Sequence, residues 1–292
     1  MARAARDDVH VRASIEPVPG PLLVVDAPSL LYRAFYALPK SITDDDGRPV
    51  NALLGSTNIV LREIEEHGPR AVVMCFGIDA AKYRVALYDG YHADRPEVPD
   101  ELAPQFAAAP GLYEALGWYT AGSDEFEADD LLGSYATVET EAGGETLILT
   151  GDRDMFQCVD DHVKVLYVRT GSRGAQVVDA AEVEARYGIP PKLVPDFIAL
   201  RGDPSDGIPG AKGVGEKTAA SLLRRYGSLE DALTGKLAAA ADQLRAFKEM
   251  ASLRRLEVER PADRATDGAG GAEAARAHGM NRLAERLASS AG

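Results

Sequence analysis

Short apolar runs recur in the first half of the chain and alternate with longer stretches of helical period. The apolar runs fall at 22–26, 71–76 and 146–150, and apolar residues repeat at helical spacing over 53–66 and 126–141. A short run that is apolar throughout is typical of a central parallel strand buried on both faces. Alternation of such strands with helices predicts an α/β fold with a doubly wound sheet. The chemistry of such a fold is expected at the carboxyl ends of its strands.

The pattern changes at about residue 179, where strand signals give way to short helices joined by glycine- and proline-rich turns. We expect these helices at 182–187, 191–200, 216–226 and 237–253. The sequence therefore predicts a loose N-terminal tail at 1–20, an α/β core at 21–178, a helical module at 179–260 and a low-complexity C-terminal segment at 261–292. We expect that last segment to be partly disordered, with one terminal helix at 280–288.

Composition places the chain among soluble globular proteins. Its 292 residues are 46% hydrophobic and 27% charged, enough for a substantial core. No apolar run approaches the roughly 20 residues that span a bilayer, and the first residues lack the apolar stretch of a secretory signal. Cys75 and Cys158 are too few for a disulfide framework or a four-cysteine zinc site. We therefore expect a cytoplasmic protein without a membrane partner.

The chain is acidic, and its acidic residues are unevenly distributed. With 46 acidic against 32 basic residues, the net charge of −14 excludes a generally basic surface for nucleic acid. Twelve of the acids and one base lie between residues 121 and 161. Such a stretch is either a solvated face or a place where bound cations offset the repulsion. The positions of the acids favour bound cations.

Eight acids in four clusters are candidate metal ligands. Each cluster alone has a structural alternative, because an aspartate at a strand end can cap a helix and acids in a first helical turn interact favourably with the helix dipole. Together, carboxylates without cysteine or histidine partners suit Mg²⁺ or Mn²⁺ better than zinc. Two such ions can activate water and stabilise the leaving oxygen in phosphodiester cleavage. The candidates are Asp26, Glu127, Asp129, Asp130, Asp152, Asp154, Asp203 and Asp206.

The glycine-rich stretch at 208–218 is a second candidate site. It approaches the pattern of a nucleotide-binding P-loop, but Glu216 precedes Lys217 and no apolar strand leads into Gly210. What remains is a turn between helices whose backbone N–H groups, with Lys212 and Lys217, can hold a phosphate without reading a base. A plain helical turn is the alternative, and it would need the glycines but not the lysines.

Four stretches, in this order, resemble the flap endonuclease / 5′–3′ exonuclease family. The resemblance is strongest to the nuclease domain at the start of bacterial DNA polymerase I and to its stand-alone relatives. The stretches are 23–26 followed by 32–35, then 126–130, 149–154, and 202–206 running into 210–218. Together they span roughly residues 20–255.

The resemblance implies a PIN-like α/β core, a helical arch near 80–110 that threads a 5′ single strand, and a helix-three-turn-helix (H3TH) module that grips duplex DNA. It places Asp26, Glu127 and Asp129 in one metal centre and the other five carboxylates around the shared centre and a second ion. Catalytic candidates are Arg84, which would steady the scissile phosphate, Arg33 and His92. Tyr91 would either stack on an unpaired base or simply pack. The DNA contacts of the H3TH module, where family members often hold K⁺, would come from Gly210, Lys212, Gly213, Val214, Gly215, Lys217 and Thr218.

Two positions depart from the family pattern. Gly77 stands where the family usually has an aspartate of the metal centre, and His92 stands where it has a lysine. Asp79 is a candidate substitute for the missing carboxylate. On this basis we expect Gly77→Asp to tighten metal binding.

The favoured hypothesis is a divalent-metal-dependent, structure-specific 5′ nuclease that hydrolyses DNA phosphodiester bonds at 5′ ends, flaps or nicks in replication and repair. One alternative is a DNA-structure-binding module with weak or no catalysis, and another is a PIN-type ribonuclease. The expected partner is DNA with a 5′ single-stranded flap, nick or end. We expect the protein to be a monomer and to associate with the nucleoid when on DNA.

Overall fold

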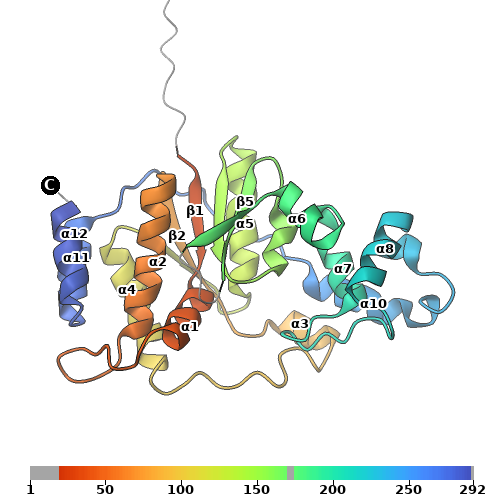
Figure 1. Ribbon diagram of the computed structural model, residues 1–292, viewed down its shortest axis with the longest axis horizontal. Coiled ribbons are helices and arrows are strands. Elements are labelled where there is room, and N and C mark those ends of the chain that lie inside the picture. Colours follow the sequence, from red (N-terminus) through yellow and green to blue (C-terminus); the bar gives the residue numbers. More distant parts are fainter. Residues whose placement is uncertain (1–19, 170–173, 291–292) are drawn as a thin grey trace, which may run out of the picture.

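The computed structural model describes residues 20–169 and 174–290, which form a six-stranded sheet with helices on both faces (Figure 1). The strand order is β3-β2-β1-β4-β5-β6, and neighbouring strands are parallel except for the antiparallel pair β5–β6. The strands are β1 Leu22–Asp26, β2 Ala71–Phe76, β3 Tyr119–Gly122, β4 Thr146–Thr150, β5 Val163–Val168 and β6 Ala175–Val178. The three predicted strands are confirmed as β1, β2 and β4, the centre of the sheet. The predicted tail, up to residue 19, lies outside the described residues.

Helices cover the sheet and form the module beyond it. The α-helices are α1 Ala27–Ala37, α2 Asn51–His67, α3 Lys82–Leu87, α4 Ala103–Ala115, α5 Ala128–Glu141, α6 Ala180–Tyr187, α7 Val194–Arg201, α8 Glu216–Tyr226, α9 Leu229–Ala232, α10 Ala241–Ala251, α11 Gly268–Ala277 and α12 Asn281–Ser290. Short 3₁₀ helices are η1 Asp154–Cys158, η2 Pro191–Leu193 and η3 Ala238–Ala240. The mixed α/β fold with an appended helical module is the one that the sequence predicts.

Alternate residues of β1 enter two different cores, which explains why its first four residues are all apolar. Leu22 and Val24 pack with α5 and the helical module, whereas Leu23 and Val25 pack with α1, α2, α4 and the C-terminal helices. A strand that is buried on both faces has no solvent-exposed position. Its first polar residue, Asp26, therefore appears where the strand reaches the carboxyl edge of the sheet.

The segment expected to form a helical arch is mostly irregular. Within 80–110, all of which is described, α3 is six residues long, and turns and extended chain then lead to residue 102. Figure 1 shows this connection running back beneath the sheet to α4. Helix α4 belongs to the cover of the sheet, because Tyr113 is fully buried and its hydroxyl lies 2.8 Å from Ser56 Oγ on α2.

Residues 252–266 run in extended conformation from the end of α10, past α5, to the start of α11. The backbone N–H of Leu256 donates to Ser134 Oγ at 2.9 Å, and Arg260 forms an ion pair with Glu139 at 2.9 Å. Arg70 donates to the carbonyl oxygen of Pro261 at 2.7 Å and pairs with the same buried Glu139. This stretch therefore joins the helical module, at one end of the molecule in Figure 1, to the C-terminal helices at the other.

The expectation of partial disorder after residue 260 is wrong for the described residues. Helices α11 and α12 pack against the sheet domain, with Ala272, Leu283 and Leu287 no more than 4% exposed. At Gly271 a Cβ would lie 2.2 Å from a methyl carbon of Leu116, so the small residues of α11 permit close packing against α4. The low complexity of the sequence thus reflects a packing requirement.

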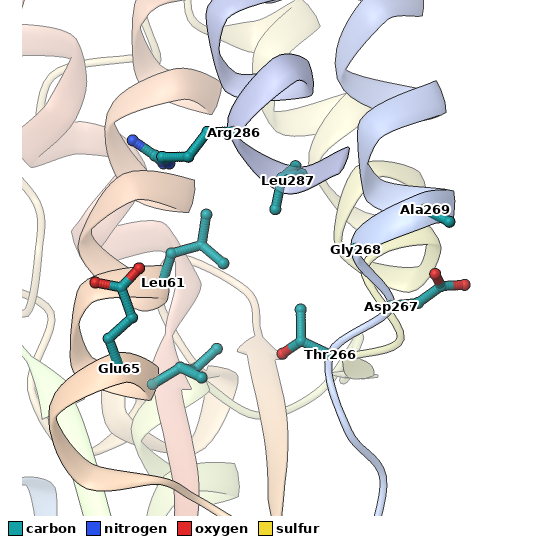
Figure 2. Close-up of a pocket in the computed structure, with 9 residues that line it drawn as sticks. Leu61, Glu65, Thr266, Asp267, Gly268, Ala269, Arg286 and Leu287 are labelled. Atoms are coloured by element: carbon teal, nitrogen blue, oxygen red, sulfur yellow. The ribbon is translucent and has the colours of Figure 1, made fainter. Parts of the chain in front are cut away.

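A pocket of about 450 Å³ lies between α2 and the last two helices, and Figure 2 shows the side chains around it, with Leu61 and Glu65 facing Arg286 and Leu287. It is formed on the flank of the sheet domain, away from the carboxyl ends of the strands. In the described part of the chain, every helix is too short or too polar to span a bilayer.

We expect Leu283→Ala to lower the free energy of unfolding by about 2–5 kcal/mol, because it removes a buried side chain that holds α12 against the core. Urea denaturation measures the change. Glu285→Ala, at an exposed position of the same helix, should change stability by less than about 0.5 kcal/mol. Equal stability of the two variants would contradict the packing of α12.

Candidate active site

At the carboxyl edge of the sheet, the hydroxyl of one threonine bridges two aspartates that come from neighbouring strands. Asp26 ends β1 and Asp152 follows β4, its neighbour in the sheet. Thr150 Oγ1 donates to Asp26 Oδ2 at 2.7 Å and accepts the backbone N–H of Asp152 at 2.9 Å. Asp26 also accepts the N–H of Ser29 at 3.0 Å, so it caps α1 as well. Sequence reasoning overlooked Thr150, although its place at the end of a central strand, directly before Gly151 and Asp152, was an available signal.

Arg33 positions the loop that carries Asp152. From α1, its Nη2 donates to the carbonyl oxygen of Gly151 at 2.7 Å. A Cβ at Gly151 would lie 1.8 Å from Arg33 Nε, so this contact requires glycine. The backbone N–H of Asp154 donates to Asp152 Oδ1 at 2.8 Å, which orients the carboxylate of Asp152.

The aspartates at this edge perturb one another. Burial, with added repulsion from Asp152 and Asp26, raises the pKa of Asp129 well above its usual value. Burial raises the pKa of Asp152 to about 6, and the carboxylates of Asp206, Asp26 and Asp203 contribute to that shift. Burial also raises the pKa of Asp154, with Asp152, Asp206 and Asp203 as further causes. Because these mutual effects require proximity, the six aspartates form one electrostatic group.

Asp203 and Asp206 reach this group from the loop between α7 and α8. Asp203 forms an ion pair with Arg201 at 2.7 Å. Asp206 Oδ1 lies 3.2 Å from His92 Nε2, while His92 Nδ1 lies 2.7 Å from the carbonyl oxygen of Asp79. Burial opposes the charged form of His92, but the hydrogen bond and charge of Asp206, together with the carbonyl oxygen of Asp79, raise the pKa of the ring overall. His92 thus joins the irregular connection after α3 to the helical module.

Two of the eight candidate ligands, Glu127 and Asp130, are paired with a candidate catalytic residue. Arg84 Nη1 lies 2.5 Å from Glu127 Oε2, and Arg84 Nη2 lies 3.1 Å from Asp130 Oδ1. All three side chains are buried. In this arrangement the guanidinium group of Arg84 is paired with the two carboxylates and is not presented to a phosphate.

Tyr91 packs within the protein, which was the alternative to stacking on an unpaired base. It is 5% exposed, its hydroxyl donates to Glu127 Oε2 at 2.9 Å, and its ring stacks on His92 with centroids 4.1 Å apart. The ring is therefore not presented to an unpaired base in this conformation.

Gly77 is closely packed. A Cβ at Gly77 would lie 2.3 Å from the backbone nitrogen of Ala128 and 2.7 Å from the Cα of Glu127. A side chain there requires the start of α5 to move, which argues against a simple gain of a ligand in Gly77→Asp; its effect on metal binding stays a prediction. Asp79 does not stand in for the missing carboxylate either, because its exposed side chain pairs with Arg95 at 2.7 Å.

The glycine-rich hairpin combines close backbone packing with exposed cationic side chains. Gly210 has a φ of +69°, and a Cβ there would lie 2.4 Å from the backbone nitrogen of Gly202. Helix α8 begins after Gly215 and has no side-chain cap, which leaves its first N–H groups without a side-chain acceptor. Lys212 and Lys217 are exposed, and the described residues give neither an ion pair. Gly213, Gly215 and Thr218 are exposed on the same hairpin, and Val214 is half-buried against the core.

A more compact group of side chains that could bind a metal lies at the end of α2, away from the six aspartates. Among the described residues, Glu63, Glu66 and His67 bring ligand atoms within 4.8 Å of one another at the end of α2. Glu63 is already paired with Arg62 at 3.0 Å, and the next residue after this helix, Gly68, contacts Gly20 before β1. The group is therefore at the amino edge of the sheet, opposite the six aspartates, which are more widely spaced.

The chain belongs to the 5′-3′ exonuclease family. Its residues 21–188 match the model of the 5′-3′ exonuclease N-terminal resolvase-like domain, and residues 189–261 match that of the C-terminal SAM fold. This membership confirms the resemblance seen in the sequence and makes the chain, by family, a 5′ nuclease.

A 5′-3′ exonuclease from Mycobacterium tuberculosis is 41% identical over 242 residues, covering 76% of this chain and 74% of that protein. DNA polymerase I from the same species is 40% identical over 232 residues, which is 77% of this chain but 25% of the polymerase. The bacteriophage T5 flap endonuclease, solved with DNA and metal ions, aligns with a TM-score of 0.64 over 92% of this chain and 98% of its own. At 16% identity, that likeness shows the fold.

We expect Gly77→Ala to lower the free energy of unfolding by about 1–3 kcal/mol, because even a methyl group must displace the backbone at the start of α5. Gly111→Ala is the matched control, since its Cβ would meet nothing within 4 Å on the exposed side of α4. That change should be neutral or stabilising by up to about 1 kcal/mol. Urea denaturation compares the two, and an undiminished stability of Gly77→Ala would refute the close packing.

Proposed function

We propose that this protein hydrolyses DNA at 5′ ends, flaps or nicks with two divalent cations, Mg²⁺ or Mn²⁺, held at the carboxyl edge of the sheet. The observation that carries the proposal is the group of six mutually repelling aspartates. Crowding one buried and five half-buried carboxylates at one place is unfavourable unless cations offset their charge. The proposed ligands are Asp26, Asp129, Asp152, Asp154, Asp203 and Asp206.

The donor set fits a hard cation. All six side chains offer carboxylate oxygens, which Mg²⁺ and Mn²⁺ prefer. Cys75, the residue paired with Asp26 in the sheet, is fully buried, and burial raises the pKa of its thiol well above the usual value. It therefore remains a thiol, which is a poor zinc ligand. Because the aspartates are more widely spaced than a closed ligand set, binding would draw them together.

The cations would supply positive charge to the scissile phosphate and activate the attacking water. The residues of the chain itself have positioning roles. Thr150 holds Asp26 and Asp152 in a fixed relation, and Arg33 holds the loop after β4. These contacts keep two of the proposed ligands in place before a substrate binds.

The hairpin at 210–218 would anchor the downstream duplex. The uncapped N–H groups at the start of α8, together with the exposed Lys212 and Lys217, suit a phosphate contacted without base recognition. Binding of this kind weakens steeply with salt. A K⁺ ion at this hairpin, a monomeric state, and a cytoplasmic location with binding to the nucleoid stay predictions.

The decisive experiment incubates a 5′-flap DNA and an RNA of matched sequence with Mn²⁺. We expect cleavage of the DNA and a loss of about 100-fold or more in rate for Asp129→Asn and Asp152→Asn, because each removes a ligand charge. Asp161→Asn changes an exposed acid in the same acidic stretch and should retain full activity.

The same experiment separates the alternatives. Tight DNA binding with no cleavage by the wild type would favour a binding module, and preferential cleavage of the RNA would favour a ribonuclease. Full activity of both Asp→Asn variants would refute the proposed cation site.

We also expect the affinity for Mn²⁺ to fall as the pH is lowered from 7 to 5. Protons compete with the cation for Asp152, because its pKa is about 6. Below that pKa the cation must displace a proton to bind, so the affinity for Mn²⁺ should fall about tenfold for each pH unit. The stability of the metal-free protein should depend on pH in the opposite direction. Its folded state keeps a proton that the unfolded state releases near the usual value of 3.8, so its stability should fall as the pH rises from about 4 to 6.

Isothermal titration of Mn²⁺ at several pH values measures the first effect, and urea denaturation at the same pH values measures the second. Asp152→Asn is the control, because it lacks the titrating group and should show a weaker pH dependence in both. An affinity that is constant from pH 7 to 5 would argue against these ligands.

A further inference from the structure

Glu127 is held in a way that differs from the other candidate ligands. It is the residue directly before α5, in the N-cap position, yet its carboxylate makes no cap for that helix. Oε1 accepts the backbone N–H of Ala81 at 2.7 Å, directly before α3, and Oε2 accepts the Tyr91 hydroxyl at 2.9 Å, after α3. One carboxylate thus holds both sides of the segment 81–95, which we call the arch base.

Arg84 extends this attachment to the helical module. Besides pairing with Glu127 and Asp130, its Nε donates to the carbonyl oxygen of Met250 at the end of α10, at 2.9 Å. Asp130 in turn accepts the backbone N–H of Arg254 at 2.7 Å. The two carboxylates and the guanidinium group are 6%, 0% and 3% exposed, respectively. Buried charges persist when they are paired and hydrogen-bonded in this way.

Gly77 brings the arch base within reach of Glu127. The backbone of Glu127 and Ala128 occupies the place of a side chain at position 77, and the N–H of Ile78 donates to the carbonyl oxygen of Phe126 at 3.1 Å. The connection after β2 therefore lies directly against the start of α5. A carboxylate is missing at position 77, and the carboxylate of Glu127 is directed to the arch base.

We propose that Glu127, supported by Arg84 and Asp130, is a positioning residue that fastens the arch base to the core and is not a ligand of the catalytic cations. By contrast, the described residues give Asp129, Asp152 and Asp154 no ion pair with a basic side chain. Asp203 and Asp206 do pair with Arg201 and His92, but their side chains are more exposed than that of Glu127. The statement that Asp129, Asp152 and Asp154 bind cations and Glu127 does not rests on the proposed function. The attachment of the arch base by Glu127 is independent of it. Tyr91 acts through the same contact, as a hydroxyl donor to Glu127.

Titration of Mn²⁺ into the full chain tests the first part. Glu127→Gln removes the charge but keeps an oxygen that can accept the N–H of Ala81, so the Mn²⁺ affinity should stay close to that of the wild type. Asp152→Asn should lower the affinity by about tenfold or more. A loss in Glu127→Gln as large as that in Asp152→Asn would overturn the proposal.

Hydrogen exchange of the backbone amides tests the attachment. Tyr91→Phe removes the hydroxyl that Glu127 accepts and keeps the ring, so amides in 81–95 should exchange about tenfold faster with unchanged Mn²⁺ affinity. Tyr36→Phe, at a position that is 72% exposed, should leave that exchange unchanged. Unchanged exchange in Tyr91→Phe would overturn the proposal. If Asp152→Asn also binds Mn²⁺ like the wild type, the cation site is wrong, and the exchange result alone decides the role of Glu127.

Discussion

Like charges cannot be brought together out of water at one edge of a sheet without something to balance them, and the architecture of this protein depends on how that is done. The topology delivers strand ends and the start of α5 to the same edge, and most of them carry a carboxylate. Glu127 and Asp130 are balanced internally by the single guanidinium group of Arg84. Asp129, Asp152 and Asp154 have no such partner within the described residues. We propose that this division separates Glu127 and Asp130, which support the fold, from Asp129, Asp152 and Asp154, which are free to accept a cation.

The sequence predicts the centre of the sheet better than its edges, for a physical reason. Strands β1, β2 and β4 are buried on both faces, so each is an uninterrupted apolar run with recognisable ends. The edge strands carry a weaker signal. β3 is four residues long and partly exposed, and β5 places the exposed Lys164 among apolar neighbours. The small residues of α11 resemble a low-complexity tail until the close approach of α4 is seen.

In the candidate site, too, some features could be predicted from the sequence and others could not. Asp26 and Asp152 could be placed from the sequence, because carboxyl ends of neighbouring parallel strands meet at one edge. The partners of the other acids could not, because pairing depends on contacts between distant segments. The spacing of Glu127 and Asp130 indicates a shared helical face but says nothing of Arg84. A missing carboxylate at Gly77 is visible in the sequence, whereas the backbone that fills its place is visible only in the fold.

The extended stretch at 252–266 has a mechanical consequence. It leaves the helical module beside Asp130 and crosses α5 to the buried pair of Arg70 and Glu139, so the module is tied to the sheet domain where the chain enters it and again where the chain leaves it. A body tethered at two separated points resists rotation about either one. Under the proposed function, the distance between the hairpin that anchors the duplex and the proposed cation site would therefore be a fixed dimension of the protein.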